Sequence, residues 1–416
     1  MQTETNTKEK FFTKPIAIIF VTILIDLIGF GIMIPVLPYY VKLPEFQASP
    51  FEIGMLFAVY SLMQFIFSPI LGGLSDKYGR RPVLFFSLLG TCAAALITGL
   101  STTLWMVFIG RMLDGVTGGN ISTAQAYIAD VTTKENRAKG MGLVGAGFGL
   151  GFILGPIIGG FLSQFGTHVP FFFVSGLALT NAISLYFFLP ESRKFNGNNN
   201  DSARISRITE LLSSFQNSRF GITVLLYFLI VVAFSIMTTS FAQYTMFRFN
   251  YDAQQNGYLF GYIGILAVVL QGGLFSRLVK AFGESWLIVI GCFLLAASLF
   301  AVPYVGPLFG GLTALLIGIA CFSVGNSLSS PALTSVASKE SAEEAQGQAL
   351  GTLQSAASLA RAIGPAIAAF LLNDAITKNV TDVTLFRTFW TASAIMLVTF
   401  LIAVYFALSH KHEVLI

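Results

Sequence analysis

GGLSDKYGRRPVL, residues 72–84, is a short charged turn with a long apolar run on either side. A turn this short between two membrane-length runs joins two antiparallel helices at one face of a bilayer. Its basic residues, Lys77, Arg80 and Arg81, indicate the cytoplasmic face, because loops rich in lysine and arginine stay on that side. Gly79 lets the backbone turn tightly.

Composition points to the same class of protein. Hydrophobic residues make up 55% of the chain and charged residues only 11%, whereas a soluble domain carries roughly 25% charge. The net charge of +4 is small and lies in loops, so no nucleic-acid partner is indicated. Cys92, Cys292 and Cys321 all fall inside apolar runs, so neither a disulfide framework nor a metal site is expected.

Apolar runs of about 20 residues, the length that crosses a bilayer, predict twelve spans. They are roughly 15–40, 53–74, 83–100, 104–129, 140–162, 170–189, 220–247, 256–277, 286–305, 308–336, 347–372 and 385–408. With the N-terminus inside, 18 of the 24 lysines and arginines lie on the cytoplasmic side and four outside. This asymmetry predicts that both termini are cytoplasmic.

The chain divides once, at its longest polar stretch. We predict an all-α membrane protein of two pseudo-symmetric six-helix bundles, 1–190 and 220–416, joined by a cytoplasmic linker, 191–219. The halves echo each other weakly, as in GPIIGG at 155–160 and GPAIAA at 364–369. Such parallel repeats suit a binding site between the halves, near the middle of the membrane.

One carboxylate is predicted deep in the first span. Asp26 lies twelve residues beyond Lys14, which at 1.5 Å per residue places it about 18 Å into the membrane. Burial favours the neutral acid, so Asp26 is a candidate for binding and releasing a proton. The alternative is a neutral aspartic acid that only hydrogen-bonds to a neighbouring helix.

Two arginines are also predicted within the membrane. Arg111 stays charged and needs a carboxylate, and Asp114 follows it at i+3 on the same side of the helix. Either the two form a structural pair, or Arg111 exchanges between Asp114, Asp26 and substrate and so couples proton to cargo. Arg361 lies near the middle of the eleventh span, where it either attracts an anionic substrate or pairs with Asp26.

The charged turn resembles the loop motif G-x-L-a-D-r-x-G-r-r, between helices 2 and 3 of the major facilitator superfamily. The matching residues are Gly73, Leu74, Asp76, Gly79, Arg80 and Arg81. The resemblance implies the major facilitator fold and transport by alternating access. It also implies a charge network that holds the halves together in the outward-facing state. That network is expected to contain Gly73, Asp76, Gly79, Arg80, Arg81, Asp130 and Arg137.

Three further stretches resemble motifs of drug exporters. Residues 26–38, DLIGFGIMIPVLP, are similar to the first-helix motif of the twelve-helix drug efflux branch, and 110–119, GRMLDGVTGG, to the family's fourth-helix motif R-x-x-x-G. Residues 147–160, GFGLGFILGPIIGG, resemble the fifth-helix motif of drug–proton antiporters, which implies export. Its residues are Gly147, Gly151, Gly155, Pro156, Gly159 and Gly160. The alternative is a role in close helix packing alone.

The N-terminal half is most similar to tetracycline efflux proteins. Those proteins carry an additional acid in the third helix, whereas residues 92–100 read CAAALITGL here. This departure argues against tetracycline itself as the substrate. Buried amides, one arginine and aromatic rings are the candidates for the substrate cavity. They are Gln64, Asn326, Gln354, Arg361, Phe148 and Phe241.

The favoured function is proton-driven export of small amphipathic or drug-like compounds by a monomer in a bacterial inner membrane. The proton gradient, rather than a cofactor, is expected to supply the energy. A transporter of a sugar, lipid or other metabolite, working by symport, is the alternative. An enzyme is disfavoured, because no nucleophile motif, His–Cys cluster or phosphate loop is found.

Overall fold

The computed structural model describes residues 13–193, 218–341 and 346–413. Of the predicted linker 191–219, residues 194–217 lie outside the described residues. The first part contains α1 (Lys14–Tyr40), α2 (Pro50–Tyr78), α3 (Arg80–Gly99), α4 (Leu104–Thr117), α5 (Asn120–Val131), α6 (Lys134–Leu162), η1 (Ser163–Phe165) and α7 (Val169–Phe188). The second part contains α9 (Ser218–Phe249), α10 (Ala253–Val269), η2 (Leu270–Leu274), α11 (Phe275–Phe282), α12 (Glu284–Ala301), η3 (Val302–Tyr304), α13 (Gly311–Lys339), α14 (Gln346–Leu372) and α15 (Asp382–Glu413).

The fourth predicted span, 104–129, is not one helix, and the prediction of a continuous helix was wrong. Gly118 and Gly119 separate α4 from α5. A Cβ on Gly119 would lie 2.8 Å from the Cα of Ser68, so the glycine allows α2 to approach closely. Gln64 of α2 donates to the carbonyl oxygen of Gly118 at 2.9 Å and satisfies an acceptor at the break. Within the described ranges, eleven other helical stretches are long and apolar enough to cross a membrane.

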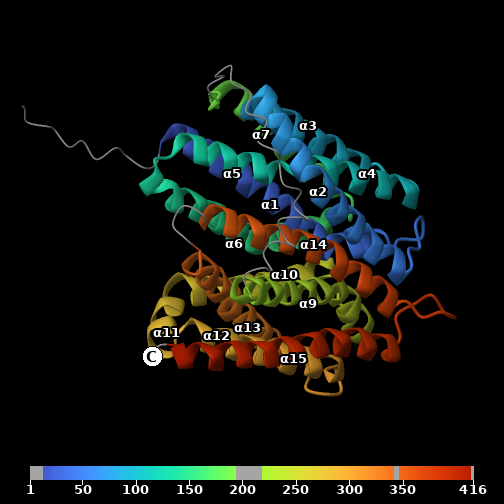
Figure 1. Ribbon diagram of the computed structural model, residues 1–416. Coiled ribbons are helices and arrows are strands. Elements are labelled where there is room, and N and C mark those ends of the chain that lie inside the picture. The colour runs from blue at the N-terminus through green and yellow to red at the C-terminus, as the bar shows by residue number, and fades with distance from the viewer. Residues whose placement is uncertain (1–12, 194–217, 342–345, 414–416) are drawn as a thin grey trace, which may run out of the picture.

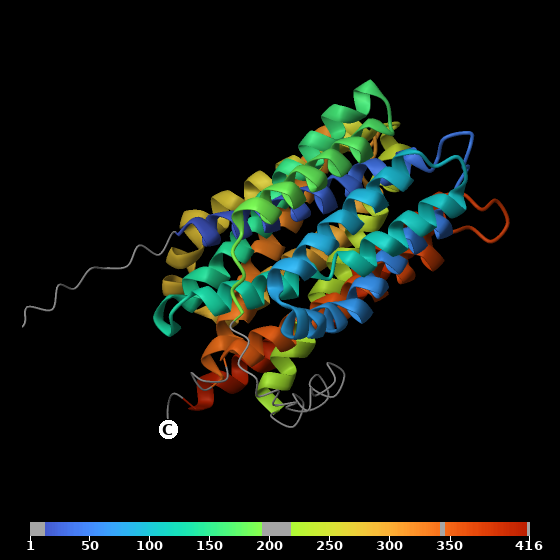
Figure 2. The ribbon, with the colours of Figure 1, turned by 90° about the horizontal axis from the view of Figure 1, so that it is seen from above.

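The helices form two halves that pack in the same pattern. In the first half α1 packs against α6 and α3 against α7. The corresponding spans of the second half pair alike, α9 with α14 and α12 with α15. Between the halves, α2 packs against α14 and α6 against α10. Figure 1 shows the blue-to-green half above the yellow-to-red half, and Figure 2 shows that the helices run roughly along one direction.

The two ends of this bundle are named here by their loops. The motif face carries the turn at Gly79, and α13 ends there at Lys339. The opposite face carries the loops that follow Tyr40 and Leu372, which lie at the right of Figure 1. Large apolar side chains cover the outside of the helices; Trp105, for example, is 78% exposed. An outer surface of this kind suits contact with lipid.

Candidate functional site

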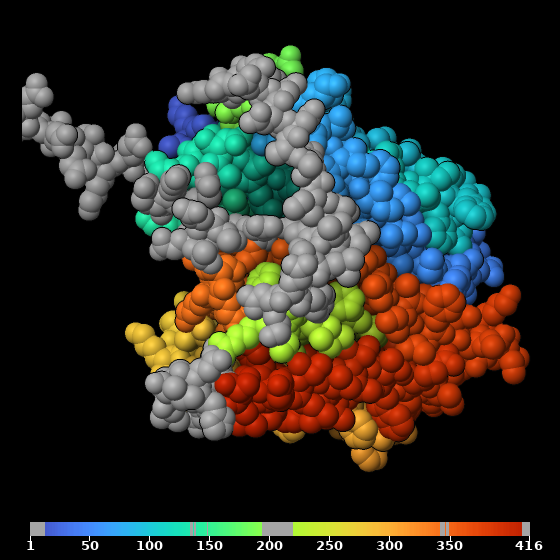
Figure 3. Space-filling model, in the orientation of Figure 1, coloured from blue at the N-terminus to red at the C-terminus, as the bar shows by residue number. Residues whose placement is uncertain are grey.

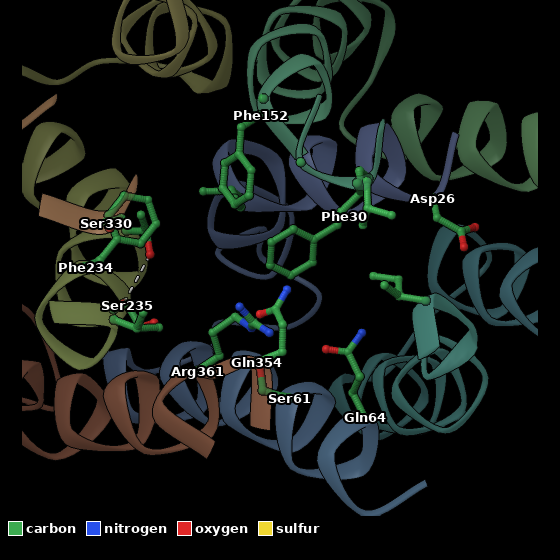
Figure 4. A pocket seen from close by; sticks show the side chains of 18 of the residues that line it. Asp26, Phe30, Ser61, Gln64, Phe152, Phe234, Ser235, Ser330, Gln354 and Arg361 are labelled. Carbon is green, nitrogen blue, oxygen red and sulfur yellow. Dashed lines mark hydrogen bonds between the residues drawn. The ribbon is translucent and has the colours of Figure 1, made fainter. Parts of the chain in front are cut away.

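A cavity of about 1030 Å³ lies between the two halves. It begins near the middle of the bundle, where Asp26 and Arg361 line it, and extends to Met141, Ser338 and Lys339 at the motif face. Figure 4 shows its central part, with side chains from both halves turned toward one another. A volume of this size is large enough for a drug-sized molecule.

Contacts between the halves close the bundle toward the opposite face. A Cβ on Gly54 of α2 would lie 2.5 Å from the Cβ of Ala369 of α14, so these helices touch backbone to backbone. The amide of Asn256 donates to the hydroxyl of Tyr39 and links α10 to α1. Figure 3 shows blue and orange surfaces meeting at this side. The cavity therefore opens at the motif face.

Asp26 lines the cavity on the side of the first half of the molecule. Asp26 is near the midpoint of α1, and the amide nitrogen of Asn120 donates to its Oδ2 atom. Its Oδ1 atom is buried and has no hydrogen-bond partner among the described residues. Asn120 is the first residue of α5, so the break after α4 places this amide against Asp26. Sequence reasoning did not identify Asn120 as the partner, although a diglycine before a polar residue within a span is a visible signal.

Arg111 lies beside the cavity and is 1% exposed. Its Nη1 atom is 2.6 Å from Oδ2 of Asp114, which lines the cavity. The guanidinium carbon stands 4.1 Å from the centre of the Tyr60 ring, in the position of a cation–π contact. Its Nε and Nη2 atoms are buried without a hydrogen-bond partner in the described part of the chain. The pair is thus formed, but Arg111 retains unused donors.

Arg361 reaches the cavity from α14 in the second half. Its Nη2 atom donates to Oγ of Ser358 at 3.2 Å, and the phenols of Tyr227 and Tyr60 line the same cavity. Among the described residues no carboxylate oxygen lies within 4.0 Å of it. Arg361 therefore does not pair with Asp26 here, and Figure 4 shows the two well apart with Phe30 between them.

A row of aromatic rings crosses the cavity between the halves. Phe30 stacks on Tyr60 at 5.7 Å and meets Phe152 edge-on at 5.8 Å. Phe152 contacts Phe234 at 6.2 Å, and Phe234 stacks on Phe322 at 5.7 Å. All five rings line the cavity. Phe30 could have been found from the sequence, because it follows Asp26 at i+4 and so shares its helical face.

Most residues predicted for the cavity lie on its wall. Gln64, Asn326, Gln354 and Arg361 line it. Phe241 does not. Its side chain is fully buried in the core of the second half, 5.4 Å from the ring of Phe260 and 6.0 Å from that of Tyr244. The side chain of Phe148 lies outside the described residues, as does that of Arg137.

The charged turn is held together by ion pairs within the first half. Arg80 contacts Asp76 at 2.6 Å and, through Nε, Asp130 at 3.2 Å. Arg193 approaches Asp76 at 3.6 Å. Glu191, after the end of α7, accepts hydrogen bonds from the backbone N–H groups of Arg80 and Arg81 at 2.9 and 3.1 Å, and so caps α3. Sequence analysis did not identify Glu191.

One glycine and one cation complete this turn. Gly79 has φ +102°, and a Cβ there would lie 2.5 Å from the carboxylate of Glu191, so the motif needs glycine at this position. The guanidinium of Arg81 lies 5.3 Å from the centre of the Tyr186 ring and donates to the Tyr186 carbonyl oxygen. Gly73 is an interior residue of α2.

The contact between Arg80 and Asp130 corrects one expectation. The pair was expected only when the motif face is closed, yet it is formed while the cavity opens there. The physical reason is that the turn and α5 belong to the same half, so separation of the halves leaves the pair intact. A latch between the halves cannot consist of this pair alone.

The glycines of α6 form two contact surfaces. Gly147, Gly151, Gly155 and Gly159 recur every four residues and face α1, where a Cβ on Gly155 would lie 2.7 Å from the Cα of Gly31. Gly160 faces the other half, where its Cβ would lie 3.1 Å from the Cα of Gly257 in α10. Pro156 lies inside α6 between these surfaces. The motif thus seats α6 against both α1 and α10.

Gly155→Ala is therefore expected to lower stability by about 1–3 kcal/mol, because backbone atoms on α1 cannot yield to the added methyl group. Gly142→Ala on the same helix is the matched control, since a Cβ there meets nothing within 4 Å. The control is expected to be neutral or slightly stabilising. Thermal unfolding of both purified variants in the same detergent measures the difference. Equal melting temperatures would show that α1 and α6 do not need the glycine.

Comparison with known proteins gives the following similarities. The family model described as Major Facilitator Superfamily matches residues 19–365 and 272–415. The tetracycline resistance protein, class H, of Pasteurella multocida is 34% identical over 369 residues, which cover 86% of this chain and 89% of that protein. Multidrug resistance protein 2 of Bacillus subtilis is 32% identical over 377 residues, covering 90% and 91%.

Solved structures show the same fold. The human organic anion transporter MFSD10 (TETRAN) superposes with a TM-score of 0.69 at 24% identity, covering 94% of this chain and 99% of that one. The nucleoside transporter NupG superposes with a TM-score of 0.72 at 11% identity, covering 95% and 99%.

Proposed function

The chain belongs to the Major Facilitator Superfamily, a family of membrane transporters, and on that premise we propose that it exports small amphipathic or drug-like compounds in exchange for protons. The observation that carries the proposal is the cavity between the halves. It combines a row of aromatic rings with Asp26, a carboxylate near the midpoint of α1 that has one oxygen without a hydrogen-bond partner among the described residues. The relatives named for tetracycline and multidrug resistance support export of drug-like cargo.

Asp26 is proposed to carry the coupled proton. An asparagine amide offers a donor on one side and an acceptor on the other. In the structure the amide of Asn120 donates a hydrogen bond to Asp26, and the Oδ1 atom of Asn120 has no hydrogen-bond partner among the described residues. A rotated Asn120 amide would instead accept a hydrogen bond from the neutral acid. The pair can therefore satisfy both protonation states of Asp26, which a proton carrier requires.

The motif face is proposed to be cytoplasmic, because the basic loops gather there. The arrangement described above is then open to the cytoplasm, ready to accept cargo from inside the cell. Export follows when the contacts at the opposite face open and the cavity closes at the motif face. The protein is proposed to act as a monomer in a bacterial inner membrane, with the proton gradient as its only energy source.

The direction of proton movement tests this proposal. Inverted membrane vesicles expose the cytoplasmic face and acquire an acidic lumen when they respire. An exported compound added outside should enter in exchange for lumenal protons, which a pH-sensitive dye reports as recovery of fluorescence. Vesicles without the protein show the background. If a panel of amphipathic compounds enters the vesicles without releasing protons, the transporter is a uniporter. If the compounds only leave together with protons, it is a symporter.

A further inference from the structure

We infer that the cargo of this cavity is amphoteric: an aromatic molecule with an anionic group bound at Arg361 and a cationic group directed to Asp26. The inference rests on the proposed function and adds the chemical class of the substrate. It follows from the charges that line the cavity, from their partners, and from what lies between them.

Four charged side chains in the described part of the chain line the cavity. Two of them are compensated within the protein. Asp114 is 2.6 Å from Arg111, and Lys339 is 2.8 Å from Glu284. The remaining two, Asp26 and Arg361, have no ion pair among the described residues. They are of opposite sign and belong to opposite halves.

Arg361 has the features of an anion contact. A guanidinium carries five N–H donors, and among the described residues the hydrogen bond to Ser358 uses one of them. Figure 4 shows Gln354 beside it, at the wall of the cavity. An arginine at the middle of a membrane is costly without a counter-charge. A carboxylate or similar anion from the cargo would supply that counter-charge and accept two hydrogen bonds in the planar geometry that arginine favours.

Asp26 offers the complementary contact. Oδ2 accepts a hydrogen bond from Asn120, and the buried Oδ1 atom has no hydrogen-bond partner in the described part of the chain. A cationic group in the cavity beside Asp26 would compete with a proton for this carboxylate, and such competition is what exchange of cargo for protons requires. An anion alone would favour the protonated acid and bind together with the proton. A cargo that carries both charges would supply the counter-charge for Arg361 and would also compete with the proton at Asp26, as antiport requires.

The aromatic side chains between Asp26 and Arg361 favour a cargo with a flat aromatic ring system. Phe30 lies between Asp26 and Arg361 in Figure 4, and its ring contacts Tyr60 and Phe152. Rings in such a row stack on a planar molecule at little entropic cost. A compound with charges at opposite ends of a flat ring system would therefore match the wall of this cavity.

Three matched probes test the inference without transport. 6-(Aminomethyl)naphthalene-2-carboxylate carries both charges, its methyl ester keeps only the cation, and its N-acetyl derivative keeps only the anion. The amphoteric probe is expected to bind the purified protein in detergent about 10- to 100-fold more tightly than either derivative, the effect of a charge-assisted contact. Naphthalene fluorescence or titration calorimetry gives the dissociation constants.

Two variants assign each preference to its residue. Arg361→Gln should remove the advantage over the ester and keep the advantage over the N-acetyl derivative; Asp26→Asn should do the reverse. Arg361→Lys, which keeps the charge, should retain part of the advantage over the ester. Lys280→Gln removes one positive charge from the exposed surface of the same half and should change neither ratio.

The outcomes separate this inference from the proposed function. Equal affinity of the wild-type protein for all three probes would overturn the amphoteric class, and this comparison needs no variant. If the affinity ratio of the amphoteric probe to its methyl ester falls as much in Lys280→Gln as in Arg361→Gln, the preference comes from the overall positive charge of the protein and not from a subsite at Arg361. If either result accompanies exchange of other compounds for protons in vesicles, the exporter stands and only the cargo class falls.

Discussion

Asp26→Asn is expected to abolish accumulation driven by a pH gradient while leaving exchange of cargo across the membrane. The asparagine keeps the shape of the side chain and a hydrogen bond with Asn120, but it cannot take up a proton. Because Asp26 lines the cavity and the asparagine has nearly the same size, the change removes the exchangeable group and little packing. Proteoliposomes with an imposed pH gradient measure accumulation, and preloaded proteoliposomes without a gradient measure exchange.

Glu45→Gln is the matched control for this variant. Glu45 lies exposed in the loop after α1, so its substitution removes a carboxylate outside the cavity. It is expected to accumulate cargo at the wild-type level. Normal gradient-driven accumulation by Asp26→Asn would exclude Asp26 as the proton site. Exchange is measured at cargo concentrations that saturate the weaker binding expected of this variant, so loss of both accumulation and exchange would instead point to a structural role of the carboxylate.

The membrane-spanning fold was largely predictable, because the bilayer imposes one length on every span. The break between α4 and α5 was not. Hydropathy is averaged over a window of residues, so it does not reveal a helix break made by two glycines. Gly118 and Gly119 nevertheless interrupt the helix and place Asn120 against Asp26. The position of Asn120 against Asp26 thus depends on two residues that a hydropathy average does not reveal.

The cavity was predictable in its polar residues and less so in its aromatic ones. A buried amide such as Gln354 needs a partner or a cavity, so its position in a span is informative. A phenylalanine in an apolar helix fits lipid, core or cavity equally well, because the helix has no polar face to orient it. Phe241 lies in the core and Phe30 lines the cavity, and the sequence alone did not show which of the two would face the cavity.

The expectation that Arg80 and Asp130 pair only when the motif face is closed was wrong for a related reason. The loop motif was recognised from its residues, but whether Arg80 and Asp130 join one half or two depends on how the spans pack. The structure shows that the pair and the cap by Glu191 stabilise the turn inside one half. Contacts across the halves, such as that between Tyr39 and Asn256, are the ones that must break during transport.

Removing both charges of the Arg111–Asp114 pair is expected to restore stability but not coupled transport. Arg111→Met alone keeps a long side chain over the Tyr60 ring but leaves Asp114 without its counter-charge. Breaking one side of a buried pair costs about 3–5 kcal/mol. In Arg111→Met/Asp114→Asn no uncompensated charge remains, so the melting temperature should return toward that of the wild type. Thermal unfolding and gradient-driven accumulation are measured on the same preparations.

The reason to expect inactivity in the double variant lies in the unused donors of Arg111. Its Nε and Nη2 atoms are buried without partners in the described arrangement, a costly state for a pair that serves structure alone. The donors can be satisfied if Arg111 finds a second acceptor when the halves move, and transport then depends on its charge. Recovery of both stability and gradient-driven accumulation in the double variant would refute this coupling role and leave the pair structural. A stable double variant that exchanges cargo without accumulating it would place Arg111 in the path between proton and cargo.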